Sequence, residues 1–543
     1  MLSFRRLSCN NIVFIIVSAA VFTFFQNIAF LNKVIHLLNM DDKSSYLLIC
    51  SFIIFLFCSL NILFSLLLIG YLRKPIIILL LFLSALVDYF SYFYDIYIDK
   101  DMIKNVLQTT VGEASSLITV KLITWIIVFA LLPSLLVVVT KINITKPWHR
   151  NLCLRLTNII LSAIILVAAF YPFYDKYVFF IKGKTNNQIV KLITPYNYIE
   201  GSIRYVKELY KKRQPFIHIG QDAKREKIAG HKKKLLILVV GETSRAMNFS
   251  LNGYQKETNP LLAKQAIINF HNATSCGTAT AVSVPCMFSV MNRVNYKASI
   301  AERQDNVLDI LSKTGVNLLW KENDEGCKGV CNRIPNIELK QIFPKEQCYA
   351  GLCFDSSLLT GLDDYIKART DDTLIVLHTN GSHGPAYFRR YQKLQEKFIP
   401  ACSTSAVETC SKEELINAYD NTIVNVDYVL NEVIELLKKH ADQYSTAMFY
   451  MSDHGESLGE KGVFLHGAPY IIAPKEQTQI PMIFWLSDSF LKDQKINKDC
   501  MFEQANNLKV SHDNLFHSLL GAMNVVTNVY EPSLDLFRAC QSK

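Results

Sequence analysis

The sequence MSDHGE at residues 451–456 directly follows the apolar run AMFY at residues 447–450. An apolar run that is rich in aromatic residues predicts a buried strand. This strand would end on Asp453 and His454, whose side chains are both ligands of metal ions. Open α/β sheets carry their sites at the carboxyl ends of strands, so the stretch predicts a metal site at the edge of a sheet.

The same pattern occurs at two upstream positions. Residues 235–240 (LLILVV) run into Gly241-Glu242-Thr243, and residues 374–377 (LIVL) run into His378 and then the GSHGP sequence at residues 381–385. A single Asp-His pair is usually a surface turn. Three strand ends with carboxylate or imidazole side chains in one domain favour a shared metal site instead.

The remainder of the chain after residue 233 alternates strand-like runs with helical periodicity, which is clearest over residues 415–440. Strands that alternate with helices predict a layered α/β domain with a largely parallel sheet.

The first 175 residues contain five apolar spans, each reaching or closely approaching the roughly 20 residues that a helix needs to cross a bilayer. The spans cover residues 12–31, 46–72, 75–97, 122–139 and 156–173. No small-residue cleavage site follows the first span, which is therefore interpreted as an uncleaved anchor. Asp88 within the third span is costly in lipid and is expected to pair inside the helix bundle.

The charges of the short loops between the spans predict the orientation. Arg5 and Arg6 precede the first span, and Arg73 and Lys74 separate the second span from the third. The basic side chains of residues 141–155 lie between the fourth span and the fifth. The N-terminus is therefore expected inside, and everything after residue 175 outside, which in a bacterium is the periplasm. The predicted domains are a transmembrane domain (1–175), a bridging interfacial segment (176–233) and a periplasmic catalytic domain (234–543).

The chain has 57 Lys and Arg residues against 47 Asp and Glu residues, a formal net charge of +10. Much of the excess lies in residues 207–234, directly after the last span. A basic run at that place contacts anionic lipid headgroups or is simply solvated. No nucleic-acid-binding motif accompanies the run, so a nucleic-acid partner is not expected.

Ten of the fourteen cysteines follow residue 270, and eight of them form close pairs. The pairs are Cys276/Cys286, Cys327/Cys331, Cys348/Cys353 and Cys402/Cys410. This spacing predicts disulfides and an oxidising compartment in preference to a zinc ribbon at Cys327 and Cys331, because no second ribbon-like pair follows. A fifth bridge between Cys500 and Cys540 stays open. The other four cysteines belong to the membrane half and are expected to be free.

Residues 276–286 (CGTATAVSVPC) form a small-residue turn between two cysteines. A bridge there would rigidify a loop that presents a hydroxyl group, and a helix beginning near Thr280 would direct its free N–H groups at a phosphate. A hydroxyl nucleophile needs activation, which a divalent metal ion held by carboxylate and imidazole would supply. The alternative is a Ser/Thr-rich helix cap without chemistry.

Together these motifs resemble those of the membrane-bound phosphoethanolamine transferases that modify lipid A, a family that includes the mobile colistin-resistance enzymes. The matching motifs are GET at 241–243, residues 275–286, NGSHGP at 380–385, SDHGE at 452–456 and LHG at 465–467. The resemblance extends over essentially the full length. It implies five N-terminal spans, a bridging segment and a periplasmic α/β domain of the alkaline phosphatase and sulfatase type.

The resemblance also implies roles for particular residues. The implied zinc ligands are Glu242, Thr280, Asp453 and His454, with Thr280 as the catalytic nucleophile. Zinc takes nitrogen and oxygen ligands in tetrahedral geometry, so three side chains and the Thr280 oxygen would complete the site. His383 and His466 would lie beside it and contact the transferred phosphate or a second zinc ion.

Three further predictions concern lysine, histidine and a loop of the membrane half. Lys328 would neutralise phosphate charge, or is a solvated loop lysine; His378 is interpreted as structural. The spacing of Asn105, Thr109 and Glu113 places them on one face of a helix. In the family a similar trio is implicated in holding the ethanolamine headgroup of the donor, and the alternative is a solvated helix face.

The expected reaction has two steps. Thr280 attacks the phosphorus of phosphatidylethanolamine and releases diacylglycerol, and a phosphate of lipid A then takes the phosphoethanolamine group from Thr280. The product would bind cationic peptides such as polymyxin more weakly. Alternatives are transfer to a lipopolysaccharide core sugar or a protein, phosphoglycerol transfer, and an inactive membrane scaffold. A monomer in the bacterial inner membrane is expected.

Overall fold

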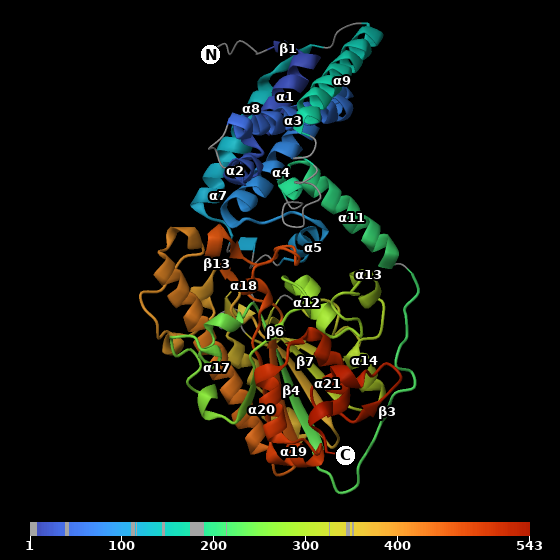
Figure 1. Cartoon of the computed structure of the whole chain (residues 1–543), viewed down its shortest axis with the longest axis vertical. Helices are drawn as coiled ribbons and strands as arrows, with labels where there is room; N and C mark the ends of the chain where they lie inside the picture. The colour runs from blue at the N-terminus through green and yellow to red at the C-terminus, as the bar shows by residue number, and fades with distance from the viewer. Residues whose placement is uncertain are drawn as a thin grey trace. The chain divides into compact units, whose positions relative to one another are not determined.

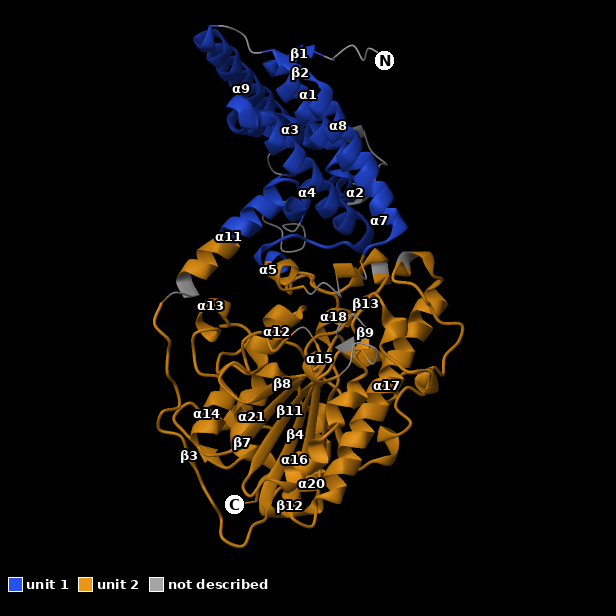
Figure 2. Ribbon diagram, turned by 180° about the vertical axis from the view of Figure 1, so that it is seen from behind, with its two compact units in different colours: residues 1–103, 118–204 blue, residues 104–117, 205–543 orange. Residues whose placement is uncertain are grey.

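The computed structural model (Figure 1) divides into two compact units (Figure 2). Unit 1 comprises residues 1–103 and 118–204, and unit 2 comprises residues 104–117 and 205–543. The structure describes residues 8–37, 43–109, 114–115, 117–143, 147–173, 177, 189–212, 214–324, 326–343, 348–349 and 352–542. The predicted three-part division at residues 175 and 233 stays a prediction.

Unit 1 is a bundle of apolar helices. Its long helices are α1 (Asn11–Phe25), α2 (Ile28–Leu37), α3 (Lys43–Leu67), α4 (Arg73–Tyr94), α7 (Val120–Ile126), α8 (Leu132–Val139) and α9 (Trp148–Phe170). The π-helical turn η2 (Ile127–Leu131) joins α7 to α8, and the strands β1 (Ser8–Asn10) and β2 (Lys141–Asn143) pair in parallel. Helices α5 (Lys100–Gln108) and α11 (Tyr196–Lys212) each have residues in both units.

Within the described residues, four helical segments are long and apolar enough to cross a membrane: Tyr46–Leu67, Gly70–Tyr94, Val120–Val139 and Trp148–Phe173. The pair Asn11–Phe25 and Ile28–Ile35 makes a fifth if the two helices form one span. The sequence predicts five spans, and the described residues contain four, or five with the bent pair counted as one span. The first predicted span is not one straight helix, because the chain bends by 55° between α1 and α2.

Polar side chains account for this bend. The Asn27 side chain donates a hydrogen bond to the carbonyl of Phe22 at 2.9 Å. The backbone N–H groups of Ile28 and Ala29 donate to the Asp88 carboxylate at 3.2 and 3.0 Å. A carboxylate at a helix N-terminus satisfies free N–H groups and interacts favourably with the helix dipole. Asp88 therefore caps α2, which is the interior pairing that its place in an apolar span predicts.

Unit 2 is built on a mostly parallel sheet that has seven strands among the described residues, in the order β5-β15-β12-β4-β11-β7-β8. The bounds are β5 (Ile267–Phe270), β15 (Met482–Leu486), β12 (Tyr444–Ser452), β4 (Lys233–Gly241), β11 (Thr373–His378), β7 (Asn317–Glu322) and β8 (Asn336–Glu338). Only the pairings made by β15 are antiparallel in this described sheet. The three strands predicted from apolar runs are neighbours at its centre.

The register of the sheet brings the polar strand ends level with one another. Ser452 at the end of β12 pairs with Gly241 at the end of β4. His378 at the end of β11 pairs with Val240 on one side and with Glu322 of β7 on the other. The carboxyl ends of four parallel strands therefore form one edge, and Glu242 and Asp453 directly follow β4 and β12 at that edge.

Helices cover both faces of the sheet (Figure 1). The long helix α17 (Lys412–Lys439) lies on one face, and α14 (Val307–Lys313), α20 (Lys498–Asn507) and α21 (Leu515–Ala522) lie on the other. Alternate residues of β4 pack into the core on the α21 side, as the two-residue period of a strand requires. The Ser411 hydroxyl and Glu414 form a capping box that begins α17 at Lys412, before the predicted start at residue 415.

The remaining elements of unit 2 are short. The helices are α12 (Thr280–Met287), α13 (Ala298–Ala301), α15 (Leu339–Ile342), α16 (Leu362–Lys367), α18 (Lys475–Thr478) and α19 (Asp488–Asp493). The paired strands are β3 (Lys224–Arg225) with β17 (Val525–Val526), β6 (Ala273–Thr274) with β16 (Val510–Ser511), β9 (Cys348–Tyr349) with β10 (Leu352–Cys353), and β13 (Ser457–Leu458) with β14 (Phe464–Leu465).

Five disulfides occur among the described cysteines. Four are the close pairs predicted from spacing, and the fifth joins Cys500 to Cys540, which the sequence left open. The cysteines outside these bridges are Cys9, Cys50, Cys58 and Cys153, as predicted. All five bridges lie in unit 2, so they stabilise the α/β domain and not the helical bundle.

Candidate functional site

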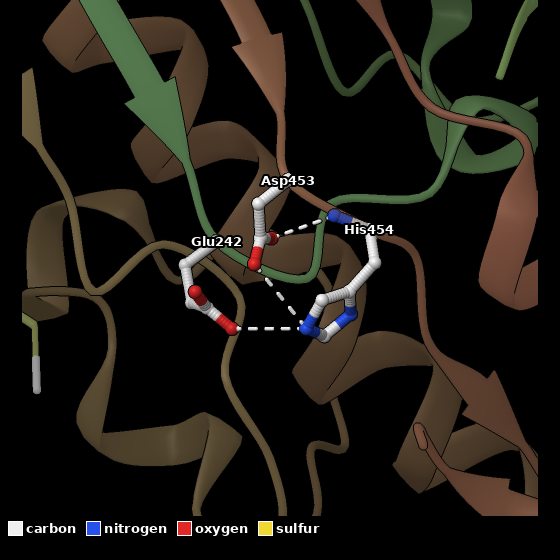
Figure 3. Close-up of side chains that lie close together, drawn as sticks. All are labelled: Glu242, Asp453 and His454. Atoms are coloured by element: carbon white, nitrogen blue, oxygen red, sulfur yellow. Dashed lines mark hydrogen bonds and ion pairs between the residues drawn. The ribbon is translucent and has the colours of Figure 1, made fainter. Parts of the chain in front are cut away.

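The carboxyl ends of β4 and β12 bring Glu242, Asp453 and His454 together (Figure 3). The His454 Nε2 atom lies 3.5 Å from Glu242 Oε1 and 3.3 Å from Asp453 Oδ2. One ligand atom of each residue lies within 4.8 Å of the others, and all three side chains are fully buried. Two carboxylates and an imidazole that converge in this way form a candidate metal site.

Thr280 completes the cluster from the N-terminus of α12. Its Oγ1 atom lies 3.2 Å from each carboxylate oxygen of Glu242 and 3.4 Å from His454 Nε2. The disulfide between Cys276 and Cys286 closes the loop and the helix that carry Thr280. The predicted helix start is confirmed, and the hydroxyl faces the positive end of the helix dipole.

The electrostatics of these residues fit a divalent cation. Burial, reinforced by Asp453 and Asp324, raises the pKa of Glu242 well above its usual range, although Lys328 acts in the opposite direction. Within the described part of the chain, Asp453 Oδ2 is buried without a hydrogen-bond partner. Buried carboxylates need a counter-charge, and a cation between these oxygens would supply it.

His454 is held in the form that binds metal ions. Its Nδ1 atom lies 2.9 Å from the carbonyl oxygen of Gly455, which accepts the ring N–H and leaves the Nε2 lone pair directed at the cluster. Burial lowers the pKa of His454 below its usual value, so the imidazole is neutral near pH 7. The structure thus brings together the four residues predicted as zinc ligands; their role as ligands stays a prediction.

His383 and His466 lie beside this cluster, where the sequence placed them. The His466 ring lies 4.5 Å from that of His454 and 5.2 Å from that of His383, measured between centroids. Burial, together with the neighbouring His466 and Arg390, lowers the pKa of His383 well below its usual value. His383 is therefore neutral near pH 7.

Glu456 fixes the orientation of His466, a function that sequence reasoning missed. One Glu456 carboxylate oxygen lies 2.8 Å from His466 Nδ1, and the other accepts a hydrogen bond from the Tyr387 hydroxyl at 2.7 Å. A ring N–H that donates to a carboxylate fixes the tautomer of the imidazole. The available signal was the position of Glu456 in the MSDHGE sequence at residues 451–456.

A second set of charged side chains adjoins the first. His378 Nδ1 lies 2.9 Å from both carboxylate oxygens of Glu322, and both side chains are buried. Burial alone would lower the pKa of His378, but Glu322 outweighs it and raises the pKa to about 9. One ligand atom each of Glu242, Asp324 and His378 lies within 4.8 Å of the others. The signal that sequence reasoning overlooked was the run of residues 318–320 into Glu322 and Asp324, another apolar strand with an acidic end.

Lys328 sits in the loop closed by the Cys327–Cys331 disulfide, in the left-handed backbone region (φ 48°). Its side chain is half-buried and lines a cavity of about 450 Å³ together with Glu302 and Asn332. Its charge lowers the pKa of Glu242, as described above. The role of Lys328 in neutralising phosphate charge stays a prediction.

The predicted trio of Asn105, Thr109 and Glu113 is only partly described, and residues 104–117 belong to unit 2. Asn105 lies in α5, and Thr109 directly follows the last residue of that helix. The Thr109 N–H and hydroxyl both donate to the Asn105 carbonyl, at 2.9 Å each. Glu113 lies outside the described residues. The shared face of these three side chains therefore stays a prediction.

The arrangement has a recognisable chemistry. A largely parallel sheet holds two carboxylates and an imidazole at its carboxyl edge, and a buried hydroxyl at a helix N-terminus faces them. These features define an enzyme of the sulfatase and alkaline phosphatase type, in which a metal ion and a side-chain hydroxyl act together on a phosphorus or sulfur centre.

Comparisons with known proteins agree with this class. The sulfatase family matches residues 234–525, and the family described as phosphoethanolamine transferase EptA/EptB matches residues 56–210. The phosphoethanolamine transferase EptA of Escherichia coli (strain K12) is 40% identical over 539 residues, 99% of this chain and 98% of that protein. The phosphatidylethanolamine transferase Mcr-1 of Escherichia coli is 37% identical over 487 residues, 87% of this chain and 89% of that protein.

A solved structure shows the same fold over the whole chain. The integral membrane lipooligosaccharide phosphoethanolamine transferase A (EptA) from Neisseria meningitidis superposes with a TM-score of 0.96 at 36% identity. The match covers 99% of this chain and 100% of that one. The chain belongs to the EptA/EptB family of phosphoethanolamine transferases.

Proposed function

We propose that this protein transfers phosphoethanolamine from phosphatidylethanolamine to a phosphate of lipid A, with Thr280 as the covalent nucleophile. The observation that carries the proposal is the approach of the Thr280 hydroxyl to Glu242 at 3.2 Å, inside a buried cluster with Asp453 and His454. Membership of the phosphoethanolamine transferase family supports the group that is transferred.

The four clustered residues would hold one zinc ion, which would supply Lewis acidity at the Thr280 oxygen and at the transferred phosphoryl group. Thr280 attacks the phosphorus atom, the bond to the diacylglycerol oxygen breaks, and phosphoethanolamine becomes an ester of Thr280. A lipid A phosphate oxygen then attacks the same phosphorus atom, and the bond to Thr280 breaks.

His466 would transfer protons during the reaction, and His383 would bind the phosphoryl group. His466 donates its Nδ1–H to Glu456, so Nε2 would be the atom that accepts a proton from Thr280 and returns it to the leaving oxygen. His383 and Lys328 would contact the phosphoryl oxygens. The role of a positively charged Lys328 at this place is to offset the negative charge of the phosphate.

The membrane half would deliver the donor lipid. The apolar helices of unit 1 would cross the bacterial inner membrane with the N-terminus in the cytoplasm and unit 2 in the periplasm. Asn105, Thr109 and Glu113 would hold the ethanolamine headgroup, because a carboxylate pairs with an ammonium ion. The product carries an ammonium group on its phosphate, which weakens the binding of polymyxin. We expect the protein to act as a monomer.

The test is intact-mass analysis of lipid A from a polymyxin-sensitive bacterium that expresses the protein. We expect lipid A to gain the mass of one phosphoethanolamine group, and polymyxin to inhibit growth less. The tryptic peptide that contains Thr280 should carry the same group when the acceptor is absent. Unmodified lipid A with a modified core sugar or protein would overturn the choice of acceptor, and a phosphoglycerol increment would overturn the choice of donor.

A further inference from the structure

A second group of metal-binding side chains shares Glu242 with the first. Glu242, Asp324 and His378 each place a ligand atom within 4.8 Å of the others, and all three are buried. They come from the carboxyl ends of the neighbouring strands β4, β7 and β11. This group contains none of the other residues assigned to the first zinc ion.

Glu322 fixes His378 in one tautomer. The Glu322 carboxylate accepts hydrogen bonds from the Trp320 indole N–H at 2.8 Å and from the Asp324 backbone N–H at 2.7 Å. It also lies 2.9 Å from His378 Nδ1. An acceptor-only carboxylate in this position takes the Nδ1–H of the ring, so Nε2 is the ring atom that a metal ion would bind. Histidines that bind metal ions commonly donate their other ring N–H to a carboxylate in this way.

The Nε2 atom of His378 points into the second group without a hydrogen bond. It is buried, and the described residues offer it no hydrogen-bond partner. The Asp324 Oδ2 atom lies 4.0 Å away, which is too long for a hydrogen bond. A metal ion that lies about 2.1 Å from each of two ligands bridges a separation of up to about 4.2 Å. The observed separation therefore fits a cation and does not fit a shared proton.

We propose that Glu242, Asp324 and His378 form a second divalent-cation site of the zinc type, with the Glu242 carboxylate shared between two metal ions. One imidazole nitrogen and two carboxylate oxygens are ligands that zinc accepts, whereas magnesium favours oxygen ligands alone. The inference rests on the proposed function only in that Glu242 also serves the first ion. Carboxylate-bridged metal pairs are a recurrent arrangement in phosphoryl-transfer sites.

The second site would act on the reaction through Glu242. A cation held by these residues would fix the Glu242 carboxylate, both oxygens of which lie 3.2 Å from Thr280 Oγ1. Asp324 and His378 are then positioning residues, because they hold Glu242 and do not touch the substrate. A cavity of about 260 Å³ is lined by Lys328, Asn336 and Glu322, the carboxylate that holds His378.

Metal analysis of the full-length protein in detergent tests the site. The protein is stripped with a chelator, loaded with zinc, passed over a chelating resin and analysed for zinc, manganese and magnesium per chain. The test variant His378→Asn keeps an N–H that can donate to Glu322 but lacks Nε2. The second variant is Asp324→Asn, which is isosteric. The matched control is His440→Asn, a buried histidine that pairs with Asp363 at 2.9 Å before the start of β12.

We expect two zinc ions per chain in the wild type and in His440→Asn, and one in His378→Asn and Asp324→Asn. Thermal unfolding shows whether each test variant is folded. If one of them is not, the zinc content of the other tests the site. One zinc ion per chain in the wild type would overturn the second site and would indicate a protonated His378 between Glu322 and Asp324. Two zinc ions per chain in both folded test variants would also overturn it. Two ions in a wild type that does not modify lipid A would leave the site standing and contradict the proposed function.

Discussion

The Thr280 Oγ1 atom lies 3.2 Å from both carboxylate oxygens of Glu242. The two residues are 38 positions apart in the sequence, one at the end of β4 and the other at the first residue of α12. The hydroxyl thus faces the fork of a buried carboxylate. Glu242 is therefore placed either to accept the hydroxyl proton or to share a cation with its oxygen.

The first prediction concerns the nucleophile. Thr280→Ala should lower lipid A modification by about a thousandfold or more, because no other group replaces the attacking oxygen. The unfolding free energy should change by less than about 1 kcal/mol, since the change removes a few atoms at a helix terminus. Lipid A mass spectrometry and thermal unfolding measure the two effects.

The matched control for this variant is Ser283→Ala in the same helix. Ser283 is buried, and its Oγ atom lacks a hydrogen-bond partner among the described residues. Loss of that hydroxyl should leave both transfer and stability close to the wild type. Appreciable lipid A modification by Thr280→Ala would rule out a covalent intermediate on this residue.

The second prediction concerns the disulfide around the nucleophile. Replacing Cys276 and Cys286 by Ser should lower the unfolding free energy by about 3 kcal/mol, the chain-entropy value for a loop of this length. Transfer should also fall, because the loop that presents Thr280 is no longer closed. Activity is measured at a temperature where the variant is still folded.

A second bridge separates stability from positioning. Cys402 and Cys410 close a loop of similar length, with a sequence separation of 8 against 10. The double Ser variant of this pair should lose comparable stability and keep its transfer activity. Equal activities in the two double variants would show that the Cys276–Cys286 bridge contributes stability alone.

The third prediction concerns pH and His517, which is remote from the catalytic cluster. Burial lowers the pKa of His517 to about 4, although Glu531 acts in the opposite direction. In the unfolded chain the pKa is about 6.5, so the unfolded state binds the proton first as the pH falls. The unfolding free energy should therefore decrease between about pH 6.5 and pH 4, by about 2 kcal/mol once partial solvent screening is allowed for.

The control is His517→Asn, which does not titrate. The Glu531 N–H donates to His517 Nδ1 at 3.0 Å, and an Asn side-chain oxygen can accept the same bond. The unfolding temperature of this variant should fall less than that of the wild type between pH 7 and pH 4. Identical pH profiles would mean that His517 is not buried in its neutral form.

The fourth prediction concerns donor binding by the membrane half. Glu113→Ala should depress transfer from phosphatidylethanolamine and spare the hydrolysis of a small soluble phosphodiester. The reason is that metal chemistry needs only the catalytic cluster, whereas lipid capture needs a group that binds the ammonium ion. Both activities are measured on correctly inserted full-length protein.

Asp101→Ala is the control for charge at this place. Asp101 is an exposed carboxylate in the first turn of α5, where it pairs with Lys100 at 2.8 Å. An exposed pair of this kind contributes little to stability, so the variant should behave as the wild type. Wild-type transfer by Glu113→Ala would return the trio to its alternative interpretation as a solvated helix face.

Much of the site follows from strand-end residues. Glu242, Asp453 and His454 each follow an apolar run, and a parallel sheet gathers such ends at one edge. Thr280 was found from the small-residue loop between two cysteines. Asp324 was missed, because the apolar run that ends on Glu322 and Asp324 was not compared with the other strand ends.

Other features had no local signal at all. The partners of Asp88 are backbone N–H groups about 60 residues earlier in the chain, and its role as a helix cap depends on how α2 packs against α4. The bond between Tyr387 and Glu456 likewise joins residues 69 positions apart. Sequence periodicity reports only on neighbours along one element, so it cannot name such partners.

The sequence by itself determined the order and type of the elements and the four short disulfides, because apolar periodicity, helix caps and closely spaced cysteines act over a few residues. The tertiary structure alone decided which strand ends meet. The register that pairs Ser452 with Gly241 and His378 with Glu322 depends on packing across the whole sheet. Only that packing brings the carboxylates, the histidines and the Thr280 hydroxyl into one buried site, where burial and mutual repulsion create the demand for a cation.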